Sequence, residues 1–145
     1  MNNIIIYLYS YIKIVFIKNY SHKKGFLLIK DNIKVNFLVV GTQKGGTTAL
    51  YSYLNDHPKI LMSEQKEIHF FDTEMNFNKE IDYDKYHSYF QYTKNETRLL
   101  GEATPIYMYW ENSIKRIYDY NHDMKLIIIL RNPIERAYSH WNMER

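Results

Sequence analysis

The chain has 145 residues, a formal net charge of +3 at pH 7 and no cysteine. This length accommodates one small domain with one hydrophobic core, and the lack of cysteine excludes disulfide bonds, thiolate metal sites and cysteine nucleophiles. The charge is too small to indicate nucleic acid as a partner, although it is compatible with anionic ligands.

The N-terminal segment, residues 1–34, contains an apolar and aromatic run at residues 4–17. The run is shorter than the roughly 20 residues that a membrane helix needs, and Lys13 places a charge inside it. It lacks the basic start and the small-residue cleavage site of a secretory signal. Two interpretations are open, a strand or helix that packs on the domain and a signal anchor. We expect a cytoplasmic protein, with membrane association through residues 4–17 as the alternative.

Residues 35–40 are an apolar, β-branched run that predicts a buried strand. The glycines of the turn at residues 41–48 let the backbone approach a ligand closely. The apolar period that begins after Thr47 predicts a helix, whose free N–H groups and partial positive charge suit an anion. Thr47 stands where the phosphate loop of ATPases has its lysine. The pattern therefore indicates an anion-binding turn in which Lys44 supplies the charge.

Residues 60–62 predict a second short strand, and residues 63–72 after it alternate between polar and apolar side chains. If this segment is extended, Glu67 and His69 share one face and their apolar neighbours the other. The apolar side chains would then hold the segment on the domain while a carboxylate and an imidazole face a cleft.

Three further elements follow in the next fifty residues. The spacing of the aromatic residues within Asp82–Tyr92 predicts an amphipathic helix that packs on the sheet. Residues 99–105 predict a short strand that ends in a turn, and residues 106–120 have helical periodicity. Residues 125–130 are the clearest strand of the chain, and we expect it to be buried on both faces.

Arg131 directly follows this last strand, at the end where ligands bind in open parallel sheets. Pro133 suits the first turn of a helix, and Ser139 lies inside that helix. A guanidinium and a hydroxyl are both suited to phosphate oxygens. Two partners for Arg131 are open: an anionic ligand, or a salt bridge to Glu135 or another carboxylate.

Three segments resemble parts of sulfotransferases that use 3′-phosphoadenosine 5′-phosphosulfate (PAPS), in particular the heparan sulfate N- and 3-O-sulfotransferases and their bacterial relatives. GTQKGGTTAL at residues 41–50 resembles their phosphosulfate loop. EIHFFD at residues 67–72 is similar to their E-x-x-F-F element, and LRNPIERAYS at residues 130–139 resembles their 3′-phosphate-binding strand and helix. GEATP at residues 101–105 resembles a fourth element, in which animal enzymes commonly have a lysine at the position of Ala103.

The resemblance implies a P-loop-like, three-layer α/β/α fold with a central parallel sheet, PAPS as donor and no metal. Lys44 would stabilise the leaving phosphate, Glu67 would be the general base, and His69 and Asp72 would help near the acceptor. Arg131 and Ser139 would hold the 3′-phosphate. The implied catalytic residues are Lys44, Glu67 and His69, and the implied donor-binding residues are Lys44, Gly45, Gly46, Thr47, Thr48, Arg131 and Ser139.

The predicted function is thus sulfuryl transfer to a hydroxyl or amine of a small-molecule or carbohydrate acceptor. One alternative is a divergent phosphate-loop kinase or ATPase, which needs an acidic residue at a strand end where this chain has Arg131. Another is an inactive fragment. We expect residues 35–145 to be the N-terminal half of a sulfotransferase domain that is truncated at its C-terminus, because the chain stops inside the helix that begins near Pro133.

Overall fold

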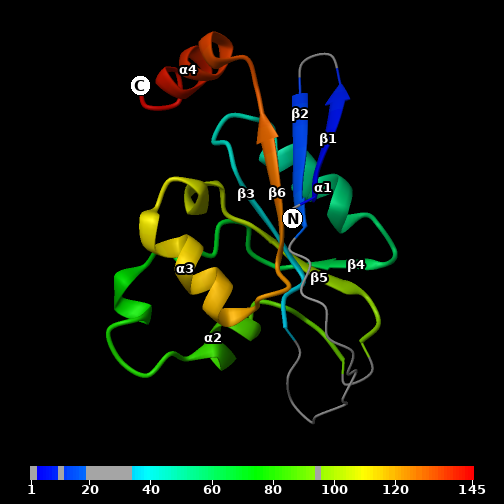
Figure 1. The fold of residues 1–145 in the computed structure, drawn as a ribbon, viewed down its shortest axis with the longest axis vertical. Coiled ribbons are helices and arrows are strands. Elements are labelled where there is room, and N and C mark those ends of the chain that lie inside the picture. Colours follow the sequence, from blue (N-terminus) through cyan, green and yellow to red (C-terminus); the bar gives the residue numbers. More distant parts are fainter. Residues whose placement is uncertain (1–2, 10–11, 19–33, 94–95) are drawn as a thin grey trace.

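A computed structural model of the protein describes residues 3–9, 12–18, 34–93 and 96–145. Its centre is a six-stranded sheet with the order β1-β2-β6-β3-β5-β4 (Figure 1). The strands are β1 (Asn3–Tyr9), β2 (Ile12–Lys18), β3 (Phe37–Gly41), β4 (Ile60–Met62), β5 (Leu99–Ala103) and β6 (Lys125–Leu130). Strands β6, β3, β5 and β4 are parallel, whereas β1 and β2 extend the sheet antiparallel beyond β6.

Helices cover both faces of the parallel part, as the α/β prediction requires. The α-helices are α1 (Thr47–Asn55), α2 (Tyr83–His87), α3 (Glu111–Tyr120) and α4 (Pro133–Trp141), and the 3-10 helices are η1 (Glu74–Asn76) and η2 (Pro105–Met108). Figure 1 shows α1 on one side of the sheet and α2 and α3 on the other. Parallel strands need a crossover connection, and α1 lies in the connection from β3 to β4 while α3 lies in the connection from β5 to β6.

The alternation of side chains along β3 divides the core into two clusters. Phe37 and Val39 face α1, and Leu38 and Val40 face the side of α2 and α3. The second of these clusters is rich in aromatic rings, among which Phe70 stacks on Tyr86 with ring centroids 4.6 Å apart. Rings of this size contribute much of the apolar area that a small domain buries. This cluster holds residues 70 and 71 firmly against the sheet.

The apolar run at residues 4–17 contributes two strands of the sheet, which agrees with the packing interpretation. β1 and β2 pair with each other, and β2 pairs with β6 from Lys13 to Ile17. Within the described ranges, no helix combines the length and the apolar character that crossing a membrane requires.

Two predicted helices differ from the structure. The helix expected within 82–92 is limited to α2, and the one expected at 106–120 is divided into η2 and α3. The division occurs at Trp110, whose backbone is extended (φ −87°, ψ 112°). Its indole N–H donates to Glu74 at 3.1 Å, so a tertiary contact lies at the point of division.

The helix after the last strand forms as its sequence predicts. The Asn132 side chain accepts hydrogen bonds from the N–H groups of Ile134 (3.0 Å) and Glu135 (3.4 Å) and so caps α4, with Pro133 in the first turn. Figure 1 shows α4 beyond the carboxyl end of β6, apart from the other helices.

Candidate functional site

The segments with the predicted site residues all meet the carboxyl edge of the parallel strands. The turn with Lys44 follows β3, the segment with Glu67 follows β4, and Arg131 follows β6. The Glu67 N–H donates to the carbonyl of Ala103, the last residue of β5, at 2.9 Å. Ligands bind at this edge in open α/β sheets.

The turn after β3 has the close approach and the free donors expected of an anion-binding turn. Gly46 has φ 105°, a conformation that side chains other than glycine rarely adopt. A Cβ on Gly45 would lie 2.8 Å from the carbonyl oxygen of Thr42. The first bond of α1 runs from the Leu50 N–H to the Gly46 carbonyl (3.1 Å), and no side chain in the described part of the chain caps the helix. The N–H groups of residues 47–49 are therefore directed to the loop side.

A cavity of about 480 Å³ lies between this turn and α4. It brings together Lys44, Arg131 and Ser139, three of the residues that the resemblance implies for donor binding. The full lining is Lys44, Arg131, Glu135, Tyr138, Ser139, Asn142 and Met143. Tyr138, from α4, and Asn142 and Met143, which follow α4, were not predicted for the site.

Arg131 has two partners in this structure. Its Nε donates to Glu135 Oε2 at 3.3 Å, and its Nη1 donates to the Lys44 carbonyl at 3.4 Å. The salt bridge named as one open partner is thus present. The Arg131 side chain is still 37% exposed, and an exposed ion pair of this kind contributes little stability. The guanidinium is therefore accessible from the cavity.

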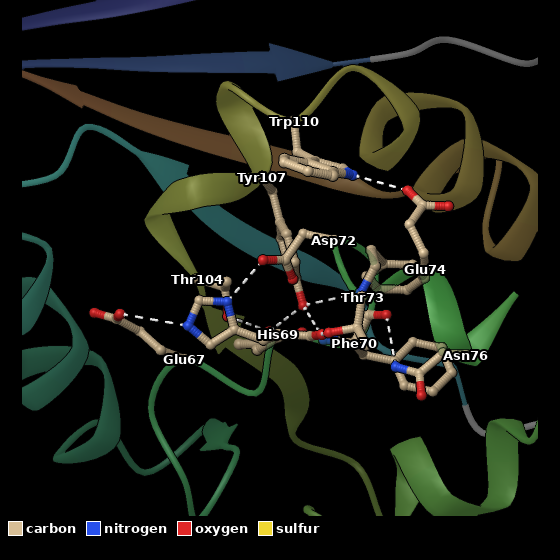
Figure 2. A network of polar contacts seen from close by, with 12 residues as sticks. Glu67, His69, Phe70, Asp72, Thr73, Glu74, Asn76, Thr104, Tyr107 and Trp110 are labelled. Atoms are coloured by element: carbon tan, nitrogen blue, oxygen red, sulfur yellow. Dashed lines mark hydrogen bonds and ion pairs between the residues drawn. The ribbon is translucent and has the colours of Figure 1, made fainter.

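Glu67, His69 and Asp72 form one chain of polar contacts (Figure 2). His69 Nδ1 lies 2.7 Å from Asp72 Oδ2, and His69 Nε2 lies 3.8 Å from Glu67 Oε2. Lys66 Nζ forms an ion pair with the other carboxylate oxygen of Glu67. An imidazole between two carboxylates can hold a proton on either ring nitrogen. The arrangement therefore offers a carboxylate that can accept a proton, with an imidazole beside it.

The backbone of this segment is not extended, so that part of the prediction is wrong. Glu67 and His69 have φ values of 61° and 57°, in the left-handed region. Such conformations cost energy outside glycine and persist where surrounding contacts fix them. Here the Glu67 N–H bonds to Ala103, and the Thr73 hydroxyl donates to the His69 carbonyl at 2.5 Å. Phe70 is buried in the core while Glu67 and His69 are partly exposed, so an apolar side chain anchors the segment as expected.

Side chains from the start of α3 hold the outer side of the same segment. Glu74 accepts hydrogen bonds from Trp110 Nε1 at 3.1 Å (Figure 2), from Asn112 Nδ2 at 3.2 Å and from Arg116 Nη2. These bonds, that from Arg116 first, lower the pKa of Glu74 to about 2. Arg116 Nη1 also donates to the Phe71 carbonyl at 2.9 Å. None of these residues was predicted for the site, since their partners lie about forty positions away in the sequence.

Glu102 is a fully buried carboxyl group in β5 that Tyr107 connects to the segment of residues 67–72. It accepts hydrogen bonds from the hydroxyls of Tyr86 (2.5 Å), Thr104 (2.5 Å) and Tyr107 (2.8 Å). Burial raises the pKa of Glu102, and the three hydrogen bonds oppose that rise. Ala103 beside it, at the position of the family's lysine, is buried in the cluster that faces α1. In the ranges that the structure describes, no group of His, Asp or Glu side chains is arranged to hold a metal ion.

Comparisons with known proteins find sulfotransferases, in agreement with the resemblance noted in the sequence. The model of the sulfotransferase domain family matches residues 34–145. The chain is 40% identical over 108 residues to the membrane-associated sulfotransferase kil1 of Dictyostelium discoideum, covering 74% of this chain and 22% of that protein. It is 40% identical over 102 residues to human heparan sulfate glucosamine 3-O-sulfotransferase 5, covering 70% of this chain and 28% of that protein.

A solved structure is similar as well. The crystal structure of a sulfotransferase from Alicyclobacillus acidocaldarius superimposes with a TM-score of 0.66 at 34% sequence identity. The match covers 77% of this chain and 50% of the bacterial one. The chain therefore spans about a quarter of the two curated relatives and half of the bacterial protein.

Proposed function

The chain belongs to the sulfotransferase domain family, and on this premise we propose that it binds PAPS and takes part in sulfuryl transfer to a hydroxyl or amine of a carbohydrate or small-molecule acceptor. One observation carries the proposal: Lys44, Arg131 and Ser139, which come from two distant segments, line one cavity. A lysine, an arginine and a hydroxyl around one cavity are a donor set that fits phosphate oxygens, and Lys44 belongs to the same turn as the free N–H groups at the start of α1.

The two phosphate groups of the donor would occupy different parts of this cavity. Lys44 and the N–H groups at the start of α1 would bind the 5′-phosphate, which carries the sulfuryl group. Arg131 and Ser139 would bind the 3′-phosphate. When the sulfur–oxygen bond breaks, negative charge increases on the 5′-phosphate, and a fixed positive group there is typically worth about 3 kcal/mol of transition-state stabilisation. Lys44 would supply that stabilisation.

Glu67 would act at the other side of the transferred group. The acceptor hydroxyl or amine loses its proton to Glu67 as its oxygen or nitrogen forms the new bond to sulfur, and adenosine 3′,5′-bisphosphate leaves. One Glu67 oxygen is paired with Lys66 and the other faces His69. The ion pair with Lys66 must open, or Glu67 must use the oxygen that faces His69, to receive the proton. Asp72 orients the imidazole from its other side.

A similar protein that is named for a carbohydrate substrate supports a carbohydrate acceptor for this chain too. The human relative is named for transfer to heparan sulfate glucosamine. The buried Ala103 offers no charged group at the position where animal enzymes commonly have a lysine. Contacts to an anionic sugar chain would therefore have to come from other residues.

Thermal unfolding in the presence of ligands tests the donor proposal. A ligand present at 100 times its Kd stabilises the folded state by about 2.7 kcal/mol, a rise of several degrees in Tm for a domain of this size. We expect adenosine 3′,5′-bisphosphate to raise the Tm and ATP with Mg²⁺ to leave it unchanged. A rise with ATP and Mg²⁺ alone would instead identify a phosphate-loop kinase or ATPase.

A further inference from the structure

We propose that Glu102 is a positioning residue that acts through the Tyr107 hydroxyl to hold the segment with Glu67, His69 and Asp72 in its reactive geometry. The inference rests on the proposed function, because it assigns Glu102 a task in sulfuryl transfer. Glu102 does not itself reach the cavity or the acceptor side, since it is fully buried. It is therefore not a catalytic residue.

The Tyr107 hydroxyl is the link between Glu102 and the segment. Its oxygen accepts hydrogen bonds from the backbone N–H groups of Phe70 (3.0 Å) and Phe71 (3.4 Å), and its proton goes to Glu102 Oε1 at 2.8 Å. Figure 2 shows Tyr107 pointing with its hydroxyl group at the backbone of this segment. Phe70 and Phe71 are the two residues between His69 and Asp72. A shift of their backbone therefore moves both ends of the His69–Asp72 contact.

The direction of these bonds makes an acceptor at position 102 necessary. A phenol oxygen has one proton and two lone pairs, and both lone pairs of Tyr107 face N–H groups. Its proton therefore requires an acceptor, and Glu102 is the acceptor present. Without it, the hydroxyl would be a buried donor without a partner or would rotate away from Phe70 and Phe71.

Packing alone does not account for a carboxyl group at this position. Burying a carboxyl costs free energy unless hydrogen bonds compensate, and an apolar residue of similar volume is often equally or more stable there. Glu102 instead accepts hydrogen bonds from three hydroxyl groups, which come from α2 (Tyr86), from η2 (Tyr107) and from the turn between β5 and η2 (Thr104). What the carboxyl adds over an apolar residue is a fixed direction for the hydroxyl of Tyr107.

The carbonyl groups of the segment are held separately from outside. The Phe71 carbonyl accepts from Arg116 Nη1 (2.9 Å) and the Phe70 carbonyl accepts from Asn76 Nδ2 (2.9 Å). The N–H side of the same two residues is held from inside by Tyr107. Loss of the inner contact should therefore release the segment without unfolding the outer contacts.

Two tyrosines give a matched test. Tyr107→Phe and Tyr86→Phe each remove one buried hydroxyl from Glu102, but only Tyr107 reaches Phe70 and Phe71. In the 145-residue chain, we expect Tyr107→Phe to speed amide hydrogen exchange at Phe70 and Phe71 about tenfold or more and to lower kcat by a similar factor, with an unchanged KM for the donor. Tyr86→Phe should leave both measurements near the wild-type values.

Substitution of Glu102 provides the conservative variant. In Glu102→Gln the amide oxygen can take the place of Oε1 and accept from Thr104 and Tyr107, while the amide N–H₂ donates to the Tyr86 hydroxyl after that hydroxyl turns. We therefore expect Glu102→Gln to keep the exchange rates and kcat, and Glu102→Leu to reproduce Tyr107→Phe.

The proposal is overturned if Tyr107→Phe and Tyr86→Phe change the exchange of Phe70 and Phe71 equally, or if Tyr107→Phe keeps the wild-type kcat. Failure of the proposed function would look different, because wild-type protein would then not bind adenosine 3′,5′-bisphosphate. The exchange comparison needs no turnover, so it decides whether Glu102 and Tyr107 hold the segment in either case.

Discussion

The Arg131 guanidinium donates from Nη1 to the backbone carbonyl of Lys44 at 3.4 Å, across 87 positions of the chain. The contact is possible because β6 and β3 are neighbouring parallel strands whose carboxyl ends open at one edge of the sheet. It places the residue implied for the 3′-phosphate beside the turn implied for the 5′-phosphate.

Replacing Lys44 removes the positive charge that we assign to the leaving phosphate. We expect Lys44→Met to lower kcat by about 10²- to 10³-fold, the usual effect of losing one preorganised donor at a developing charge. Single-turnover transfer from labelled PAPS would measure this. Lys59→Met is a suitable control, because Lys59 is exposed and does not line the cavity. Equal rates for the two variants would contradict the role of Lys44.

Glu135 should compete with the donor for Arg131, because its carboxylate pairs with the guanidinium at 3.3 Å. Glu135→Gln removes that competitor and one negative charge from the cavity lining. An exposed pair is worth at most about 1 kcal/mol, so we expect up to about fivefold tighter binding of adenosine 3′,5′-bisphosphate by calorimetry. Glu144→Gln changes the net charge equally outside the lining. Weaker binding by Glu135→Gln would show that the carboxylate contributes to the site.

Replacing Glu67 tests the proposed base independently of donor binding. Glu67→Gln keeps the size of the side chain but cannot accept the acceptor proton, so we expect kcat to fall about 10²- to 10⁴-fold. The affinity for adenosine 3′,5′-bisphosphate should stay at the wild-type value. Glu64→Gln is a control from the same segment, since Glu64 is exposed. A loss of donor affinity in Glu67→Gln would place Glu67 in the donor site instead.

The stability of the domain should depend on pH through Glu102. Burial raises the pKa of Glu102, so the folded state favours the protonated carboxyl. The stability gained in this way is fully present below the ordinary pKa of 4.5 and is lost as the pH rises through the pKa of the folded state. Glu102→Gln cannot ionise. We therefore expect the free energy of unfolding of Glu102→Gln to increase relative to that of wild type as the pH rises from about 4 to about 7. Urea denaturation at several pH values would measure this difference.

The opposite slope would mean that the three hydroxyl donors lower the pKa of Glu102 below its unfolded value. Because all other titratable groups are shared by the two proteins, the difference between their curves isolates Glu102.

The strands and the glycine turn after β3 were predictable because their signals are local. The apolar runs before Gly41 and Arg131 form β3 and β6, and the glycines at 45 and 46 mark the close turn between β3 and α1. Strand burial and turn geometry depend mainly on neighbouring residues, so a short stretch of sequence predicts them.

Long-range hydrogen bonds account for what the sequence did not predict. Glu67 adopts a left-handed backbone conformation without glycine where its N–H bonds to the distant Ala103, and His69 adopts one where the Thr73 hydroxyl, four positions along the chain, donates to its carbonyl. Glu102 was not predicted as a site residue, since its donors Tyr86 and Tyr107 look like ordinary core aromatics in the sequence. The only local signal was a charged residue inside an otherwise apolar strand, which is rarely buried unless it has partners.

If the cavity holds the PAPS donor, it should prefer a nucleotide that carries a 3′-phosphate. Calorimetry would compare adenosine 3′,5′-bisphosphate with adenosine 5′-monophosphate in wild type and in Arg131→Gln. We expect wild type to bind the bisphosphate about tenfold or more tightly, a difference of about 1.4 kcal/mol, and Arg131→Gln to bind both ligands alike. Equal affinities in wild type, or a preference that persists in Arg131→Gln, would contradict the assignment of this cavity to the PAPS donor.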